Sequence, residues 1–194
     1  MSATVNAPFG LRPAYSPSGV IRPTAFTCAS GYAQNIFQNQ PVRIAPATSG
    51  GETEGTLVAS VVGDAFIGTF QGVEFTDSDG RRRVSNKWTS GTVATEIVAY
   101  ATLDPSIVYE IQANGSITVA DIGSQADFTT AGTGSTVTGL STMMLDMATI
   151  TNSASQGLRI IGIASGPNNT PGDAFTIVQV QISEHQNVAD RVAY

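Results

Sequence analysis

The clearest pattern along the chain is a run of β-forming residues over 66–75, interrupted by Gly68 and Gly72. Glycines inside such a run indicate a β-bulge or the close approach of another backbone segment. The polar tetrad Asp77-Ser78-Asp79-Gly80 follows, in which aspartate side chains can accept hydrogen bonds from nearby amides and glycine tolerates positive φ. Residues 81–88 then return and end on the only tryptophan. These residues predict a β-hairpin.

Short β-forming runs recur along the rest of the chain, separated by Gly, Pro and Asn turns. In 107–112 the apolar residues alternate, with period two. The dipeptide Asn114-Gly115 is a hairpin signal and predicts a return strand over 116–120. Residues 121–142 are expected to be a loop with one short strand or turn, and 143–147 a short helix or strand. Further strands are predicted over 20–29, 36–37, 42–44, 56–62, 91–101, 158–164 and 175–183.

At least eight short strands with regularly spaced turns are typical of an all-β fold, an antiparallel β-sandwich or barrel with little helix. In 175–183 the apolar positions change from odd to even numbers, which indicates a bulge or burial on both faces. The β-rich domain is expected to span residues 24–184, followed by a polar C-terminal tail over 185–194.

The first 23 residues differ from the rest. Four prolines and two glycines exclude a helix there and disfavour a central strand. Phe9, Leu11 and Tyr15 are apolar but have no periodic partners. We therefore expect residues 1–23 to be an extended N-terminal arm that is ordered by docking, with a disordered terminus as the alternative.

The composition favours a protein whose surface is covered by other subunits. Charged residues make up 12% of the chain, against about 25% in ordinary domains, while hydrophobic residues make up 41%. Eight of the nine basic residues are Arg, the cation that interfaces prefer, and Lys87 is the single lysine. The net charge of −6 argues against nucleic acid as a partner.

Neither a signal peptide nor an apolar run of about 20 residues is present, so we expect no membrane partner and synthesis in a reducing cytoplasm. Cys28 is the only cysteine, which excludes a disulfide framework, and it is expected to be a small buried apolar residue.

The search for catalytic chemistry gives negative results. His185 is the only histidine and is expected to be exposed or at an interface. No nucleophile elbow occurs, and the scattered acidic residues offer no preferred pair for glycoside hydrolysis. The tetrad at 77–80 resembles the start of a calcium loop, but the arginines after it would repel a cation. We expect no catalytic residue, no metal and no cofactor.

The run Arg81-Arg82-Arg83 has three interpretations. On a strand, Arg81 and Arg83 share a face and Arg82 points the opposite way. The arginines could form salt bridges with Asp77, Asp79 or neighbouring acids, contact an acidic partner surface, or bind nucleic acid, although no second basic cluster supports the last interpretation.

Several short motifs follow one another in order over nearly the whole chain. They are Asn6 to Pro13, Gly68 to Asp77, Gly80-Arg81-Arg82 with Trp88, Gly91-Thr92, Asp104-Pro105, Tyr109 to Gly115, Thr138 to Ser141, Leu158-Arg159-Ile160, Gly172 to Phe175 and Ile182 to Gln186. In this order they resemble the head decoration (cement) proteins of tailed bacteriophages.

The resemblance implies a virion structural protein that is made in the host cytoplasm and lies on the capsid exterior, bound to the major capsid protein, with no catalytic residues. It also implies a homotrimer, the symmetry that fills local three-fold positions of a capsid lattice. The alternatives are a tail or baseplate component, or a carbohydrate-active β-domain. The candidate capsid or subunit contacts are Pro8, Phe9, Leu11, Arg12, Tyr15, Arg81, Arg82, Arg83 and Trp88.

Overall fold

The computed structural model describes residues 3–46, 52–129, 134–152 and 156–188, which form strands and two short 3₁₀ helices. No helix in these ranges is long and apolar enough to span a membrane. The helices are η1 (Val119–Asp121) and η2 (Met147–Thr149). The strands are β1 (Arg12–Tyr15), β2 (Pro23–Phe26), β3 (Pro41–Ile44), β4 (Leu57–Ala59), β5 (Gly68–Asp77), β6 (Arg82–Ser85), β7 (Ala94–Thr102), β8 (Val108–Gln112), β9 (Gln125–Ala126), β10 (Leu158–Ile163) and β11 (Ile177–Ile182).

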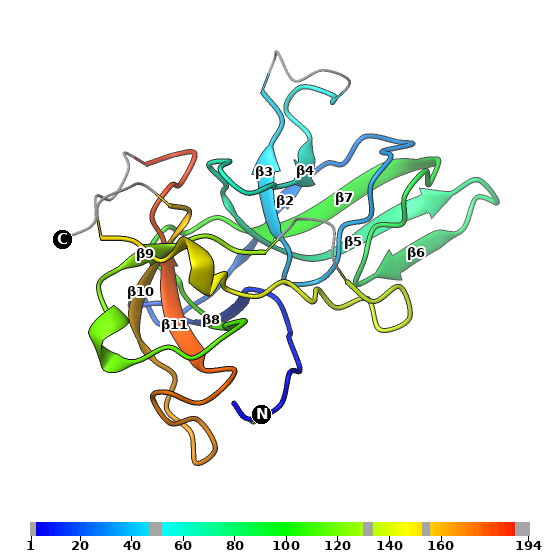
Figure 1. Cartoon of the computed structure of the whole chain (residues 1–194). Coiled ribbons are helices and arrows are strands. Elements are labelled where there is room, and N and C mark those ends of the chain that lie inside the picture. The colour runs from blue at the N-terminus through cyan, green and yellow to red at the C-terminus, as the bar shows by residue number, and fades with distance from the viewer. Residues whose placement is uncertain (1–2, 47–51, 130–133, 153–155, 189–194) are drawn as a thin grey trace.

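The strands form two antiparallel sheets that pack together, as the sequence predicts for an all-β sandwich (Figure 1). One sheet has five strands in the order β1-β8-β11-β10-β9. The other has six, in the order β2-β7-β5-β3-β4, with β6 beside β5. The chain crosses between the sheets from β1 to β2 and again from β7 to β8. Residues 16–22 and 103–107 therefore lie at the junction of the sheets.

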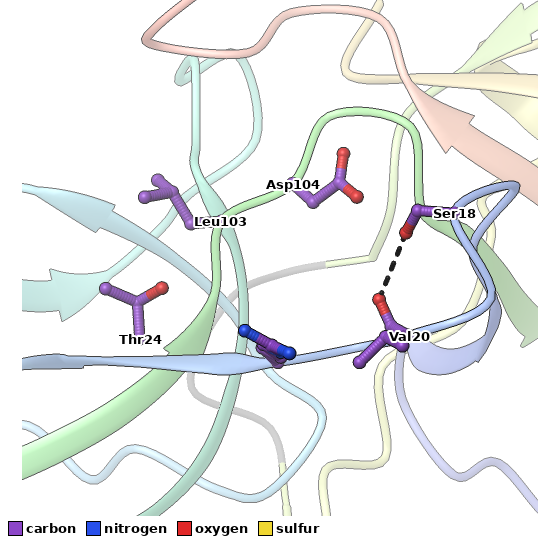
Figure 2. Close-up of a pocket in the computed structure, with 6 residues that line it drawn as sticks. Ser18, Val20, Thr24, Leu103 and Asp104 are labelled. Atoms are coloured by element: carbon purple, nitrogen blue, oxygen red, sulfur yellow. Dashed lines mark hydrogen bonds between the residues drawn. The ribbon is translucent and has the colours of Figure 1, made fainter.

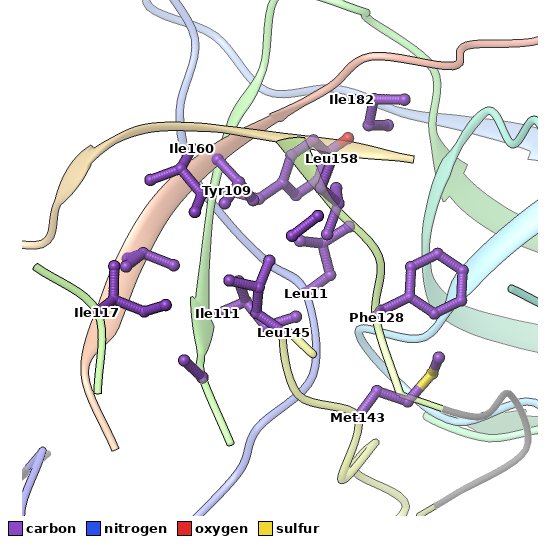
Figure 3. Packing of buried hydrophobic residues seen from close by; sticks show 14 of the residues in the cluster. Leu11, Tyr109, Ile111, Ile117, Phe128, Met143, Leu145, Leu158, Ile160 and Ile182 are labelled. Atoms are coloured by element: carbon purple, nitrogen blue, oxygen red, sulfur yellow. The ribbon is translucent and has the colours of Figure 1, made fainter. Parts of the chain in front are cut away.

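Each sheet has its own hydrophobic cluster. Behind the five-stranded sheet, Tyr109 and Ile111 of β8 pack with Ile160 of β10, all fully buried (Figure 3). Ile107, Tyr109 and Ile111 all belong to this cluster, which confirms the face predicted from their alternation, although Val108 on the other face is buried as well. The second cluster, behind the six-stranded sheet, includes Phe75 and Trp88, whose rings meet edge to face with centroids 5.6 Å apart.

The predicted hairpin forms as β5 and β6. The Gly80 amide donates to Asp77 O at 2.9 Å, and Gly80 has a φ of 77°, so the turn uses the residue that tolerates this conformation. Gly72 lies where the β5–β7 register shifts, a bulge. At Gly68 a Cβ atom would lie 2.1 Å from the Thr102 carbonyl oxygen. Both predicted roles of glycine, bulge and close approach, therefore occur in one strand.

Other predicted strand regions also contain strands or bridges, but Asn114-Gly115 does not form a hairpin. The two edges of β8 are already paired with β1 and β11, so a return strand has no edge to join. The Asn114 side chain instead bonds Asp146 Oδ1 and the Met147 amide. Residues 119–121 form η1. Of the two alternatives for 175–183, burial on both faces is found, since the consecutive residues Ile177 and Val178 are both buried. The register shift lies in the paired strand β10, between Ile160 and Gly162.

The segment expected to be an N-terminal arm, residues 1–23, already contacts the domain at Ala3, whose amide donates to Asn168 O at 2.9 Å and whose carbonyl accepts the Phe175 amide at 2.7 Å, which corrects the boundary at residue 23. Leu11 is fully buried in the first cluster, and its amide donates to Asn39 O at 2.8 Å. Residues 12–15 form β1 on the edge of the five-stranded sheet. Pro13 is compatible with this position because an edge strand leaves alternate amides without a partner. Phe9 and Leu11, two of the three apolar residues without periodic partners, thus pack on their own domain.

The C-terminal boundary at residue 185 is also corrected. The Phe66 amide donates to Glu184 O at 3.1 Å and the Gln186 amide to Phe66 O at 3.2 Å, so the chain pairs with the segment before β5. His185 is 4% exposed, and its Nε2 lies 3.1 Å from Leu103 O. The expectation of an exposed or interfacial histidine is therefore wrong. The rest of the predicted tail, 189–194, lies outside the described residues.

Candidate interaction surfaces

The N-terminal candidates separate into buried and accessible side chains. Leu11 is fully buried and Phe9 is 9% exposed, in contact with Ala164 and Ile177. Pro8 is half-buried, and Tyr15 is 48% exposed at the end of β1. Of these candidates, Tyr15 is thus the one with a large exposed surface for contact with a partner.

Arg12 lies in the chain between the buried Leu11 and the exposed Tyr15, and its side chain is partly exposed. Its guanidinium lies over the Phe9 ring, 4.7 Å from the centroid, and forms a salt bridge with Glu110 of β8. Stacking and ion pairing together hold the planar guanidinium in one orientation. The Arg12 side chain is therefore held partly exposed at the surface, and Glu110 neutralises its charge.

The arginines of the β5–β6 hairpin are paired within the hairpin, as the first interpretation of the run requires. Arg83 contacts Asp77 at 2.6 Å and Asp79 at 3.0 Å. On the opposite face, Arg82 contacts Glu74 at 3.2 Å. Arg81 is 3.7 Å from Asp79 and its side chain is 80% exposed. The run therefore presents little uncompensated positive charge.

These contacts also set the protonation of the acids. The Ser78 amide and then Arg83 lower the pKa of Asp77. For Glu74, the hydrogen bond from the Tyr100 hydroxyl is the larger cause of a lowered pKa, followed by Arg82. Both carboxylates are therefore charged at neutral pH, which maintains the ion pairs.

The outer face of this hairpin contains residues that sequence reasoning missed. Val84 of β6 is directly across from Glu74 of β5 and is 81% exposed. A shallow hollow of about 290 Å³ beside it is lined by Gly72, Val84 and Tyr100 among others. Within the described residues β6 pairs with β5 and leaves its other edge open. The alternation of Arg82 and Val84 was the signal that could have identified this face.

Trp88 and Leu11 are corrected as contact candidates. Trp88 is 0% exposed, and its indole packs on Phe75 in the second cluster. Its Nε1 has no hydrogen-bond partner within the described ranges. A side chain that is fully buried in a core cannot contact a capsid, so both residues act through the stability of the domain.

The described residues offer little for nucleophilic or metal chemistry. Burial raises the pKa of Cys28 to about 12, which keeps the thiol protonated at neutral pH. The His185 ring accepts the Asn187 amide at Nδ1, at 3.1 Å, and is held against Leu103 O through Nε2. In the part of the chain that the structure describes, no group of three or more His, Cys, Asp or Glu side chains is placed to hold a metal ion.

Comparisons of the chain with protein-family models, with curated proteins and with solved structures found no match.

Proposed function

We propose that this protein is a head decoration protein of a tailed bacteriophage, which binds the outside of the major capsid lattice and stabilises it without catalysing a reaction. The observation that supports this most is the ordered series of motifs that resembles this family from Asn6 to Gln186. A decoration protein acts by mass action: because it binds only the assembled shell, it lowers the free energy of that shell relative to free subunits.

The surface is compatible with such a role. Large apolar side chains are exposed at several places on a rigid β-scaffold, among them Val84 at 81%, Val93 at 67% and Tyr15 at 48%. Together with the low share of charged residues, they provide area for contacts with neighbouring subunits. Stable packing in two clusters keeps these side chains in place before binding, which reduces the entropy cost of docking.

A homotrimer seated between capsid subunits is part of the proposal. Within the described residues, β2 and β6 lie at two different open edges of the six-stranded sheet. Two different edges can pair head to tail between copies, and a head-to-tail interface closes into a ring when the rotation permits.

The experiment is a binding assay with empty capsids assembled from the major capsid protein. We expect the purified protein to co-sediment with these capsids at saturating stoichiometry and to raise the temperature at which they disassemble. Binding to isolated tails or baseplates but not to capsids would replace the proposal with the tail alternative. Failure to bind any virion component would overturn both.

A further inference from the structure

A cleft of about 620 Å³ opens where the β1–β2 connection passes the end of β7 (Figure 2). Its walls come from two segments far apart in sequence, residues 18–24 and residues 103–104. The residues that line it are Ser18, Val20, Arg22, Thr24, Leu103 and Asp104. None of them belongs to the contact candidates identified from the sequence.

The wall formed by the β1–β2 connection is held by hydrogen bonds. The Gly19 amide donates to Ser16 O at 2.8 Å, which closes a turn, and the Ser18 hydroxyl donates to Val20 O at 3.3 Å. The Ser16 hydroxyl donates to Asp104 Oδ2 at 3.1 Å and thereby joins the two walls. Because the chain's own hydrogen bonds hold both walls, a ligand does not have to order them on binding.

The lining combines apolar surface with polar groups. Val20 is 51% exposed, and Leu103 packs on the second hydrophobic cluster at the base of the wall. Val20, Arg22 and Thr24 are alternate residues along one segment, so methyl groups, a guanidinium and a hydroxyl follow one another along one wall. A ligand chain in extended conformation also has alternate side chains on one face, so its side chains can lie opposite these three groups.

Arg22 is the charged group of the cleft that is available to a ligand. Arg12, Arg43 and the three hairpin arginines each have a carboxylate within 4 Å. Arg22 has none among the described residues. Asp104, in contrast, already accepts hydrogen bonds from Ser106 and Ser16. An unpaired guanidinium beside apolar surface is suited to a carboxylate, with which it forms charge-assisted, bidentate hydrogen bonds.

We propose that this cleft docks an extended acidic segment of the major capsid protein, with a carboxylate on Arg22 and a neighbouring apolar side chain against Val20 and Leu103. The ligand chemistry follows from the cleft, whereas the identity of the partner rests on the proposed function.

The chemistry is tested with a peptide, independently of capsids. Acetyl-Val-Glu-Val-amide is titrated into the isotopically labelled protein and compared with acetyl-Val-Gln-Val-amide. We expect the Glu peptide to shift the amide resonances of residues 18–24 and 103–104 with saturation, and Arg22→Gln to abolish this response. Equal responses to the two peptides, a response that survives Arg22→Gln, or no response to millimolar Glu peptide would overturn the carboxylate site.

The partner is tested with capsids. Because loss of one charge-assisted pair weakens binding by about tenfold or more, Arg22→Gln is expected to lower capsid affinity by that factor. Lys87→Gln is the matched control, since it removes one positive charge from a residue outside the cleft. If both variants bind capsids like the wild type, the cleft does not dock the capsid protein and the proposed function stands. If the wild type itself fails to bind, the proposed function fails.

Discussion

The Thr102 hydroxyl lies 2.9 Å from the Tyr109 hydroxyl, and this contact joins the last residue of β7 to β8 in the other sheet. Thr102 Oγ1 also accepts the Thr69 amide at 2.8 Å from β5. Thr69, Thr102 and Tyr109 are all fully buried. Burial raises the pKa of Tyr109 well above its ordinary value, so the phenol stays protonated and can donate. The two sheets are thus connected by a buried chain of hydroxyl groups.

Removing one of these hydroxyl groups should destabilise the protein. The loss should depend on how many buried hydrogen-bonding groups are left without a partner. Tyr109→Phe is expected to lower the free energy of unfolding by about 1 kcal/mol, the net value of one hydrogen bond. Thr102→Val should cost more, about 1 to 3 kcal/mol, because it also leaves the buried Thr69 amide unpaired. Urea denaturation measures both changes. Equal losses in the two variants would contradict this role of Thr102.

Gly68→Ala should be strongly destabilising. Its φ of 156° is rare for other residues, and the new Cβ would meet the Thr102 backbone oxygen at 2.1 Å. We expect a loss of about 4 kcal/mol or more, the range of severe backbone and packing conflicts. Gly63→Ala is the control: its φ of 84° is also positive, but no atom lies within 4 Å of the new Cβ. It should lose only about 1 to 2 kcal/mol, the cost of the left-handed conformation. Similar midpoints in thermal unfolding would argue against the close approach.

Stability in acid should depend on Asp104. Hydrogen bonds from the Ser106 side chain and amide, followed by one from Ser16, lower the pKa of Asp104 below its ordinary value of 3.8. A carboxyl whose pKa is lower in the folded state adds stability above its unfolded pKa, and this contribution is lost as the pH falls through the folded pKa. Asp104→Asn should therefore destabilise the protein at pH 7 and make the acid-induced loss of stability smaller. Urea midpoints of both proteins across the acidic range test this, and parallel curves would exclude the role of Asp104.

The N-terminal segment should affect stability and capsid binding through different residues. Leu11→Ala removes a fully buried side chain and is expected to lower the free energy of unfolding by about 2 to 5 kcal/mol. Tyr15→Ala, at an exposed site, should change stability by about 0.5 kcal/mol or less but reduce capsid occupancy. Unfolding curves and co-sedimentation with capsids measure the two effects. A Tyr15→Ala variant that binds capsids normally would remove Tyr15 from the contact surface.

The trimer can be tested at the open edge of β6. Sedimentation of the isolated protein at micromolar concentration should give the mass of three chains. Val84→Ser removes an exposed methyl pair at this edge, so we expect it to weaken self-association while leaving the unfolding midpoint of the subunit unchanged. A wild-type protein that sediments as a monomer, and that also shows monomeric density on the capsid, would refute the trimer.

Local features were predictable from the sequence. The β5–β6 hairpin depends on Asp77 to Gly80, which are adjacent in the chain, and the ion pairs of Arg83 with Asp77 and Asp79 lie within the same turn. The face of β8 followed from alternation, because successive strand residues point to opposite sides whatever their partners are. The all-β class followed from the number and spacing of such strands.

Strand pairing, burial and the cleft depend on which distant segments of the chain lie side by side, and only the tertiary structure decided these. Asn114-Gly115 has hairpin propensity, but β1 and β11 already occupy both edges of β8. The burial of Leu11, Trp88 and His185 depends on contacts with residues far along the chain, which no local pattern encodes. Arg22 faces a cleft only because residues 103–104 lie across from it. Composition and periodicity determined the kind of sheet, whereas long-range pairing determined which side chains remain at the surface for a partner.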